Sequence, residues 1–445
     1  MGRKRISGVL TVALNGRVVG YLARAADGAT RFDYERDWLD WGYAIPVSQS
    51  MPLLERPFTG AAVRAVFDNL LPDDDHIRAK IAARVGADGT NAFSMLAALG
   101  RDCVGALQFL PEDMSPAPPG PPEGELLTDD AIAERIRSLS VAPLGIRGGG
   151  DAFRISLAGA QDKTALLYCD GQWFEPSGTT PTTHILKPQI GKVQTANGEV
   201  DLLESVQNEH FCMAFCRALG LPVAQTEILR LEDDLLVLSI ERFDRRLDNK
   251  GRLLRLPQED MCQALGVLPT GKYESDGGPG IKDCLNVLKS SDTPDDDRRV
   301  FMKAQIIFWM IGATDGHAKN FSLFMQPGER FHMTPLYDIL STQWQHDSRQ
   351  IPRNAFRLAM AVGDRRRYKV SEIAPRHFEQ MAKLAGFPTD ELRTVMGEIV
   401  SDFPHASETV TDKLDECVPE SMVEAILTAA RKRAGQIEIE LNRST

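Results

Sequence analysis

Apolar residues follow two different spacings in the first hundred positions. Between Gly8 and Ala23, valine and leucine residues flank Asn15-Gly16, a pair typical of a tight hairpin turn. From Thr59 to Leu99 the apolar residues recur at helical intervals. The pattern therefore predicts a hairpin followed by helices.

Proline and glycine residues mark the next boundary. The stretch Ser115–Gly124 reads SPAPPGPPEG, a composition typical of an extended linker. Beyond it, Arg154–Trp173 is predicted to form a strand, a glycine-containing loop and a second strand. Ser156 lies on the first of these strands, and the alternation of a strand places it on the face opposite Ile155 and Leu157.

Two short apolar strands are predicted next, one before and one after a predicted helix in the sequence. The first, His184–Pro188, contains Lys187, and the second, Leu235–Ile240, runs into Glu241-Arg242-Phe243-Asp244. The helix between them, Asp201–Leu219, is followed by Gly220 and Pro222, which end helices.

The C-terminal half is predicted to be helical. A buried helix begins at Thr293-Pro294 and ends in the apolar run Ile306–Ile311, and the chain from Val370 to Leu441 is helical with breaks at Pro388 and Pro404. These boundaries predict four parts: a strand-and-helix subdomain at 1–113, a linker at 114–129, a β-rich lobe at 130–245 and an all-helical lobe at 246–445.

Composition and charge narrow the class of protein. The 445 residues are 43% hydrophobic and 25% charged, and the net charge of -11 argues against broad coating of nucleic acid. Seven cysteines without a CxxC pair predict reduced thiols. The N-terminus has no apolar signal segment and the apolar runs are shorter than a membrane span, so a cytoplasmic protein is expected.

The apolar run Ile306–Ile311 leads directly into Gly312–Phe321, which reads GATDGHAKNF. Asp315 and Asn320 have the spacing at which a kinase catalytic loop carries its aspartate, which accepts the proton of the attacking hydroxyl, and its metal-binding asparagine. Asp338 follows where a kinase has its second metal-binding aspartate. For the decapeptide alone, a helix end followed by a polar loop is the alternative.

The order of the other segments agrees with a kinase. A loop between antiparallel strands covers the ATP phosphates in protein kinases, whereas the Walker A consensus is absent here. Lys187 follows on a strand, as the phosphate-binding lysine of kinases does. Glu204 and Glu209 on the next helix are both candidates to pair with Lys187, and the sequence does not choose between them.

Together these segments resemble the HipA family, the serine/threonine-kinase toxins of type II toxin–antitoxin modules. The resemblance covers nearly the whole chain and rests on specific stretches: FDNLLPD at 67–73, ISLAGAQDKT at 155–164, HILK at 184–187, ERFD at 241–244, GATDGHAKNF at 312–321 and Tyr337-Asp338. It implies an α/β (α+β) protein with a two-lobed protein-kinase-like fold. The N-terminal lobe would be β-rich with an added N-terminal subdomain, and the C-terminal lobe would be all-helical.

The resemblance also implies roles for individual residues. Asp315 would be the catalytic residue, Asn320 and Asp338 would hold Mg²⁺, and Ser156 would be the site of an inhibitory autophosphorylation. The Gly148–Gly150 run before the loop departs from the family pattern. The residues that would bind ATP are Ala158, Gly159, Ala160, Gln161, Asp162 and Lys163 of the phosphate loop, Lys187, the hinge residues Glu241, Arg242 and Phe243, and His317, Ala318, Lys319, Asn320, Tyr337 and Asp338.

The implied activity is an ATP- and Mg²⁺-dependent serine/threonine protein kinase. Its implied substrate is an aminoacyl-tRNA synthetase, typically the glutamyl enzyme, whose phosphorylation halts translation and promotes dormancy and persistence. The implied partners are a HipB-like helix-turn-helix antitoxin and operator DNA, bound mainly through that antitoxin as a repressor complex that contains a toxin dimer. No membrane partner is expected.

Two other functions are compatible with these residues. A phosphotransferase for a small molecule or lipid would have the same ATP groups and a closed, substrate-sized pocket. A non-enzymatic corepressor would keep the fold to bind antitoxin and operator, but the intact Lys187, Asp315, Asn320 and Asp338 argue against it. The basic residues Arg365, Arg366, Arg367 and Lys369 are either a solvated loop or a contact to DNA phosphates.

Overall fold

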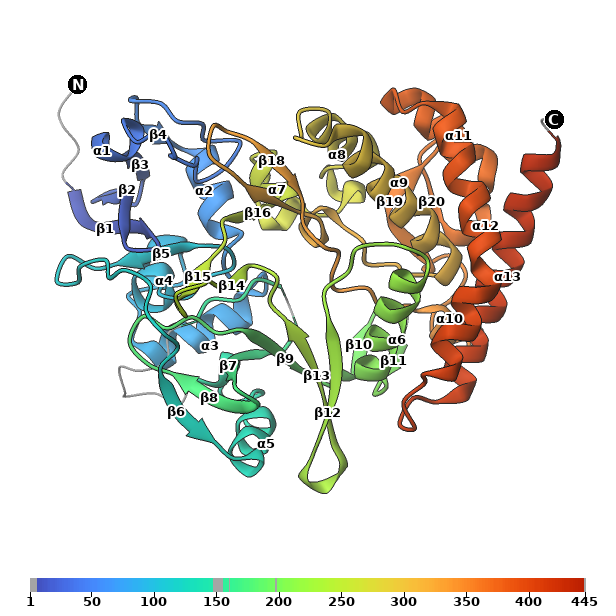
Figure 1. Cartoon of the computed structure of the whole chain (residues 1–445), viewed down its shortest axis with the longest axis horizontal. Helices are drawn as coiled ribbons and strands as arrows, with labels where there is room; N and C mark the ends of the chain where they lie inside the picture. The colour runs from blue at the N-terminus through green and yellow to red at the C-terminus, as the bar shows by residue number, and fades with distance from the viewer. Residues whose placement is uncertain (1–5, 147–154, 160, 197, 444–445) are drawn as a thin grey trace. The chain divides into compact units, whose positions relative to one another are not determined.

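The computed structural model describes residues 6–146, 155–159, 161–196 and 198–443. The chain divides into two compact units, each built from segments far apart in the sequence (Figure 1). The first unit contains Met1–Pro188, Leu229–Thr270 and Leu323–Phe331, and the second contains Gln189–Ile228, Gly271–Ser322 and His332–Thr445.

The N-terminal part of the first unit is a five-stranded sheet covered by helices. The strand order is β4-β3-β2-β1-β5. The predicted hairpin is confirmed, because Leu14 pairs with Arg17 across Asn15-Gly16, and both turn residues have positive φ. The predicted helical region is divided into three helices. The elements are β1 (Ile6–Leu14), β2 (Arg17–Ala25), β3 (Thr30–Tyr34), α1 (Arg36–Leu39), β4 (Phe58–Thr59), α2 (Ala61–Asp68), α3 (Asp75–Val85), α4 (Ala92–Leu99) and β5 (Leu107–Leu110).

A second sheet has the strand order β12-β13-β9-β7-β8-β6. Helix α5 (Asp129–Arg137) buries Ile132 and Ile136 against the sheet residues Leu166, Leu186 and Val237. The strands are β6 (Gly124–Leu127), β7 (Thr164–Cys169), β8 (Gln172–Pro176), β9 (His184–Pro188), β12 (Thr226–Leu231) and β13 (Leu235–Glu241).

The strand predicted before the glycine-containing loop does not form in the described residues. Ile155 makes one isolated bridge to Asp102, and residues 156–158 have no strand pairing. Ile155, Ser156 and Leu157 are all buried, so the predicted alternation of faces is wrong. The reason is that Ile155 and Leu157 pack into the N-terminal hydrophobic core and Ser156 hydrogen-bonds inside it. Arg154, at the start of the predicted strand, lies outside the described residues.

The second unit is mainly helical. Helices α9 (Pro294–Ile311), α12 (Thr389–Asp412) and α13 (Glu420–Arg443) pack side by side (Figure 1). The other helices are α6 (Ser205–Ala218), α8 (Ile281–Leu288), α10 (Gln343–Asp347) and α11 (Pro375–Ala385). Two antiparallel ribbons accompany them, β10 (Gly191–Thr195) with β11 (Gly198–Leu202) and β19 (Arg357–Val362) with β20 (Arg367–Lys369). The second ribbon lies within 246–445, so the prediction that this part of the chain is all-helical is wrong.

One predicted break of the C-terminal helices is found and the other is not. Pro388 is the N-cap of α12, as expected, whereas Pro404 lies inside α12. A proline costs a helix one backbone hydrogen bond. The helix continues because its apolar side, including Ile399, Phe403 and Ala406, is buried where α12 packs on α9 and α13.

The remaining strands and the remaining α-helix are short. They are the ribbon β14 (Arg245–Leu247) with β15 (Leu253–Arg255), the helix α7 (Met261–Ala264) and a three-stranded sheet of β16 (Gln258–Asp260), β17 (Ser322–Met325) and β18 (Phe331–Met333). None of the described helices is long and apolar enough to cross a bilayer.

Glu259 on β16 is a buried carboxyl group in the first unit. Its Oε1 accepts a hydrogen bond from the N–H of Gln49 at 2.8 Å, and only 1% of the residue is exposed. Burial raises the pKa of Glu259 from the usual value of 4.5 to about 8, although the hydrogen bond from Gln49 opposes this shift. The residue is therefore expected to be protonated in the folded protein at neutral pH.

Replacing Glu259 with glutamine should remove a pH dependence of stability. The folded-state pKa is raised, so the stability contributed by this group is full below pH 4.5 and is lost as the pH rises toward 8. From pH 5 to pH 8, wild type should lose up to about 4 kcal/mol of unfolding free energy relative to Glu259→Gln. Urea unfolding of both proteins over this pH range is the measurement, and parallel profiles would contradict the expectation.

Candidate functional site

The loop that carries Asp315 begins where the buried helix α9 ends. Gly312 terminates the helix in the left-handed conformation, with φ of 70°, and its N–H donates to the carbonyl of Phe308. A Cβ at Gly312 would lie 2.7 Å from the ring of Phe356, so both the turn and the packing require glycine. The loop therefore leaves a well-packed helix at a fixed point.

Hydrogen bonds to one carbonyl close the loop 315–320. Nδ2 of Asn320 and the N–H of His317 both donate to the carbonyl oxygen of Asp315, each at 2.8 Å. His317, Lys319 and Asn320 are buried, whereas the Asp315 side chain is 59% exposed. The carboxylate of Asp315 thus reaches the surface from a buried base.

Tyr337 connects this loop to Asp338. Its hydroxyl donates to the carbonyl of Lys319 at 2.8 Å and lies 2.6 Å from Oγ of Ser322. Asp338 has a φ of 60°, a left-handed conformation that is uncommon for residues other than glycine and occurs repeatedly at functional sites. The segment around Asp338 is therefore held in a specific, strained geometry.

Asn320 and Asp338 have the donor atoms that Mg²⁺ prefers. Because Nδ2 of Asn320 is engaged within the loop, the side chain presents Oδ1, and Asp338 presents a carboxylate. The described residues contain no cluster of three or more His, Cys, Asp or Glu side chains that could hold a metal ion. Magnesium commonly binds one or two protein oxygens together with substrate phosphates, so Oδ1 of Asn320 and the carboxylate of Asp338 fit this ion.

In the first unit, the candidate phosphate loop is fixed by the turn that follows α2. Oγ of Ser156 donates to the carbonyl of Leu70 at 2.7 Å, and the N–H of Asp73 donates to the carbonyl of Gly159 at 3.2 Å. Gly159 also forms a bridge with Pro72 and has a φ of 101°. We call these contacts of residues 70–73 with Ser156 and Gly159 the loop clamp.

Two side chains of the loop complete its conformation. Nζ of Lys163 donates to the carbonyl of Ala158 at 2.5 Å, and Nε2 of Gln161 donates to the carbonyl of Pro188 at 3.2 Å. Ala160 and the Gly148–Gly150 run lie outside the described residues. A hollow beside the loop is lined by Pro72, Ile77, Pro143, Leu144, Leu157, Gly159, Gln161, Asp162 and Lys163.

Lys187 is buried on β9, opposite Leu238 of β13. In the second unit, Glu209 is buried on α6 and Glu204 is the N-cap residue of that helix. Both glutamates stay predicted partners of Lys187.

The predicted hinge Glu241–Phe243 continues from β13. Glu241 lies opposite His184 of β9, and the N–H of Arg242 donates to the carbonyl of Thr183 at 2.8 Å. The Arg242 side chain is only 2% exposed and is engaged in buried ion pairs. If Arg242 binds ATP, it would therefore do so through its backbone groups.

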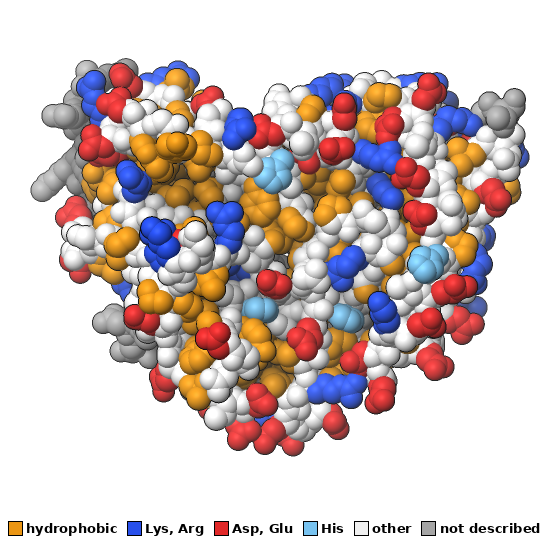
Figure 2. Space-filling model, viewed as in Figure 1, with side chains coloured by type: hydrophobic (Ala, Val, Ile, Leu, Met, Phe, Trp, Pro, Cys, Tyr) orange, Lys and Arg blue, Asp and Glu red, His pale blue; other side chains and the backbone are white. Residues whose placement is uncertain are grey.

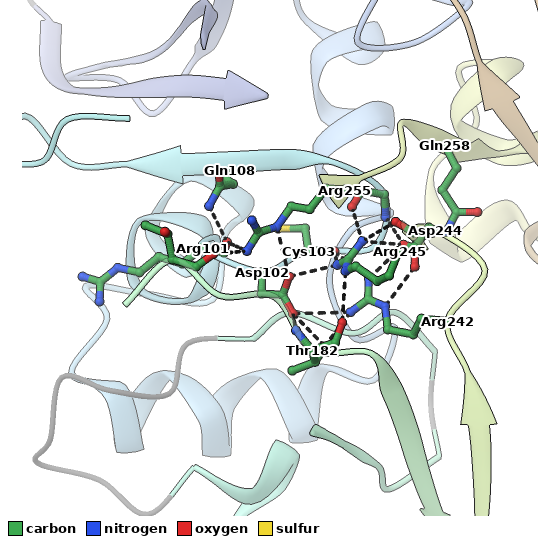
Figure 3. Close-up of polar contacts among 12 residues, drawn as sticks. Arg101, Asp102, Cys103, Gln108, Thr182, Arg242, Asp244, Arg245, Arg255 and Gln258 are labelled. Atoms are coloured by element: carbon green, nitrogen blue, oxygen red, sulfur yellow. Dashed lines mark hydrogen bonds and ion pairs between the residues drawn. The ribbon is translucent and has the colours of Figure 1, made fainter. Parts of the chain in front are cut away.

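Arg242 belongs to a buried cluster of five charged residues, together with Asp102, Asp244, Arg245 and Arg255 (Figure 3). Asp102 accepts hydrogen bonds from Nη2 of Arg245 at 2.9 Å and from Nε of Arg255 at 3.2 Å. Asp244 accepts from Nε and Nη2 of Arg242 at 3.0 Å and 2.8 Å. All five residues are at most 9% exposed, and they join positions 102, 242–245 and 255 of the chain. We call these residues the Asp102 cluster.

The electrostatics of the Asp102 cluster depend on its ion pairs. Burial alone would raise the pKa of Asp102, but Arg245, Arg242 and Arg255 outweigh it and hold the pKa well below its usual range. Burial and the neighbouring Arg242 lower the pKa of Arg245 to about 10. The backbone of Asp102 also contacts the segment that enters the candidate phosphate loop, because its carbonyl accepts the N–H of Ser156 at 3.1 Å.

The basic residues at 365–369 are largely paired within the second unit. Arg366 pairs with Glu274 at 3.2 Å, Arg367 with Asp364 at 3.3 Å and Lys369 with Glu372 at 2.8 Å. On the face drawn in Figure 2, Lys and Arg side chains are interspersed with Asp and Glu. These pairs reduce the positive charge that this run could offer to DNA.

Two residues that contact the predicted site, Asp102 and Tyr273, were not identified from the sequence. Asp102 lies far from the hinge in sequence, and only its tertiary pairing shows the connection. Tyr273 donates its hydroxyl proton to Oδ1 of Asp315 at 2.6 Å, although its sequence context is only a glycine-rich polar loop. The YESDGG sequence contains no kinase motif that could have indicated this contact.

Family models and relatives agree on one family. The model of the HipA N-terminal domain matches residues 10–110, and that of the HipA-like C-terminal domain matches residues 155–407. The putative kinase Y4mE of Sinorhizobium fredii is 34% identical over 97% of this chain and 99% of its own. The serine/threonine-protein kinase toxin HipA of Shewanella oneidensis is 29% identical over 80% of this chain and 78% of its own.

A solved structure has the same fold. It is the complex of HipA, HipB and operator DNA from Shewanella oneidensis, with a TM-score of 0.78, 23% identity and coverage of 97% of this chain and 99% of the matched chain. At this identity the likeness concerns the fold, and it confirms the α/β, kinase-like class.

Replacing Asp102 with asparagine should strongly destabilise the first unit. Removing one partner of a buried ion pair leaves uncompensated charge, so the expected loss is about 3–5 kcal/mol of unfolding free energy. Urea unfolding is the measurement. The matched control is Asp248→Asn, which loses a partly exposed pair with Arg252 and should change stability little. Equal unfolding midpoints for Asp102→Asn and wild type would contradict a stabilising role of the cluster.

Proposed function

The chain belongs to the HipA family, and from this premise we propose that it is an ATP- and Mg²⁺-dependent serine/threonine protein kinase that acts as the toxin of a toxin–antitoxin module. The observation that carries the proposal is the loop of Asp315, with an exposed carboxylate on a buried base and Asn320 fixed to the same loop. Kinase names of the relatives support the reaction class.

Each candidate residue has a role in this proposal. Asp315 orients the acceptor hydroxyl and accepts its proton. Asn320 and Asp338 hold Mg²⁺, which when bound neutralises charge on the ATP phosphates. Lys187 and the loop of Ala158–Lys163 position the phosphates, the backbone of Glu241–Phe243 binds adenine, and His317–Asn320 with Tyr337 border the nucleotide. The parts at 1–113, 114–129, 130–245 and 246–445 are the proposed functional divisions.

We propose a protein substrate rather than a small molecule. The 59% exposure of the Asp315 side chain favours an acceptor presented from outside over one enclosed in a pocket. By family resemblance the substrate is an aminoacyl-tRNA synthetase of the glutamyl type, so that phosphorylation halts translation and promotes persistence in the cytoplasm.

The proposed regulatory partners are a HipB-like antitoxin and operator DNA. The related HipA has been solved with HipB and operator DNA, which supports these partners here. The net charge of -11 favours DNA binding mainly through the antitoxin, in a complex that contains a toxin dimer. Arg365, Arg366, Arg367 and Lys369 would be a subsidiary contact. The complex would repress its own operon.

Asp315→Ala should lower the rate of phosphoryl transfer sharply without unfolding the protein. A lost general base typically costs on the order of 10²–10⁴-fold in rate. The purified chain is incubated with labelled ATP, Mg²⁺ and lysate of the source cells, and the labelled proteins are identified by mass spectrometry. A folded Asp315→Ala protein that labels the same proteins at the wild-type rate would contradict the proposal.

Ser156 should be autophosphorylated, and the modified form should bind ATP weakly. The hydroxyl is fully buried and bonded to Leu70, so a phosphate of charge about -1.5 to -2 has no room there and must break the loop clamp. Peptide mass spectra after incubation with ATP locate the phosphate, and calorimetry compares ATP affinity of the two forms. Phosphate absent from Ser156, or equal affinities, would contradict the switch.

A further inference from the structure

One oxygen of the Asp315 carboxylate is engaged by a side chain outside the catalytic loop. Tyr273 donates its hydroxyl proton to Oδ1 at 2.6 Å, and its ring meets the His317 ring edge-on, with centroids 5.0 Å apart. Oδ2 lies 4.0 Å from Nε2 of His317, which is beyond hydrogen-bond distance. Within the described residues, Oδ2 accepts no hydrogen bond. Tyr273 therefore fixes one oxygen and leaves the other available.

The backbone around Tyr273 is held in a compact turn. Its carbonyl accepts the N–H groups of Asp276 at 3.1 Å and Gly278 at 3.0 Å. A Cβ on Gly278 would lie 1.9 Å from the carbonyl oxygen of Gly271, so the turn closes only with glycine at this position. The carbonyl of Lys272 accepts the N–H of Ala318, which ties this turn to the catalytic loop.

Glu274 anchors the same turn to the ribbon β19–β20. Its Oε2 accepts the N–H of Ala361 at 2.6 Å, and its Oε1 pairs with Nε of Arg366 at 3.2 Å. Arg366 also donates to the backbone carbonyl of Glu274 at 3.2 Å. Tyr273 thus stands on a segment fixed by its own turn, by the catalytic loop and by the ribbon. A side chain held in this way is suited to stay hydrogen-bonded to Asp315 during the reaction. It is less suited to block Asp315 and be displaced when an acceptor binds.

We propose that Tyr273 is a positioning residue for phosphoryl transfer, which rests on the proposed kinase function. Its hydroxyl fixes the carboxylate of Asp315 through Oδ1, so that Oδ2 faces the acceptor hydroxyl. In the reaction, the acceptor oxygen bonds to the γ-phosphorus of ATP, the bond from that phosphorus to the ADP oxygen breaks, and the acceptor proton passes to Oδ2. Tyr273 keeps its own proton throughout.

The test is Tyr273→Phe, which removes the hydroxyl and keeps the ring against His317. The rate of label transfer from ATP to lysate protein at saturating ATP should fall about tenfold, the size expected for one hydrogen bond to a charged group. The KM for ATP should stay within about twofold, because positioning acts on the transfer step. Thermal melting of the variant shows whether the fold is kept.

Tyr368→Phe is the matched control. It removes a hydroxyl that accepts from Arg366 at 3.0 Å beside the same Glu274, without contact to Asp315, and should leave the rate unchanged. In an Asp315→Ala background, Tyr273→Phe should have no further effect, since two residues that act as a unit are not additive.

Three outcomes would overturn the inference while leaving the kinase proposal intact. The first is a rate of label transfer by Tyr273→Phe equal to that of wild type. The second is a higher rate, which would mean that Tyr273 competes with the acceptor for Asp315. The third is a loss of rate on Tyr273→Phe that is as large in the Asp315→Ala background as in wild type. Wild type that transfers no more label than Asp315→Ala would instead refute the proposed function itself.

Discussion

The buried carboxylate of Asp102 is the constraint on which the first unit depends. Its side chain forms ion pairs with Arg245, Arg242 and Arg255, and its backbone carbonyl accepts a hydrogen bond from the N–H of Ser156. One residue of the N-terminal subdomain therefore contacts both the predicted hinge and the segment that enters the candidate phosphate loop. A buried cluster of this kind adds less to stability than its ion pairs suggest, because desolvation offsets their attraction. The cluster instead specifies the structure. The charges of the cluster are all paired only when the predicted hinge and the candidate loop are in the arrangement observed.

The second unit positions its predicted catalytic group by a different device. Here an apolar helix, α9, ends at Gly312 and sets where the loop of Asp315 begins. The loop is then closed by hydrogen bonds to a single carbonyl, from Asn320 and His317. The result is an exposed carboxylate on a rigid base, which is the combination that a group accepting a proton from an external hydroxyl requires. Tyr273 adds a third hydrogen bond to Asp315, and this one goes to the carboxylate.

Local signals in the sequence predicted local structure well. The turn at Asn15-Gly16 and the helix beginning at Pro294 were predictable because each depends on neighbouring residues. The family motifs predicted the fold class, which is confirmed, and the site residues, which stay predictions. What could not be predicted depends on distant partners: Asp102 and Arg255 are 153 positions apart. The predicted alternation around Ser156 was wrong because tertiary burial, rather than strand pairing, fixes that segment. Pro404 was wrongly predicted to break a helix for a similar reason, because packing of α12 outweighs the lost hydrogen bond.

The burial of Ser156 places a condition on its proposed autophosphorylation. The hydroxyl is fully buried and bonds to the carbonyl of Leu70, while the N–H of the same residue bonds to Asp102. A phosphoryl group can reach Oγ only when this contact is open, so the modification would take place from a minor, locally open state. The same contact would help to hold the loop in place for ATP. The stability of the clamp between residues 70–73 and the loop would then set both how long the proposed kinase stays active and how readily it switches itself off.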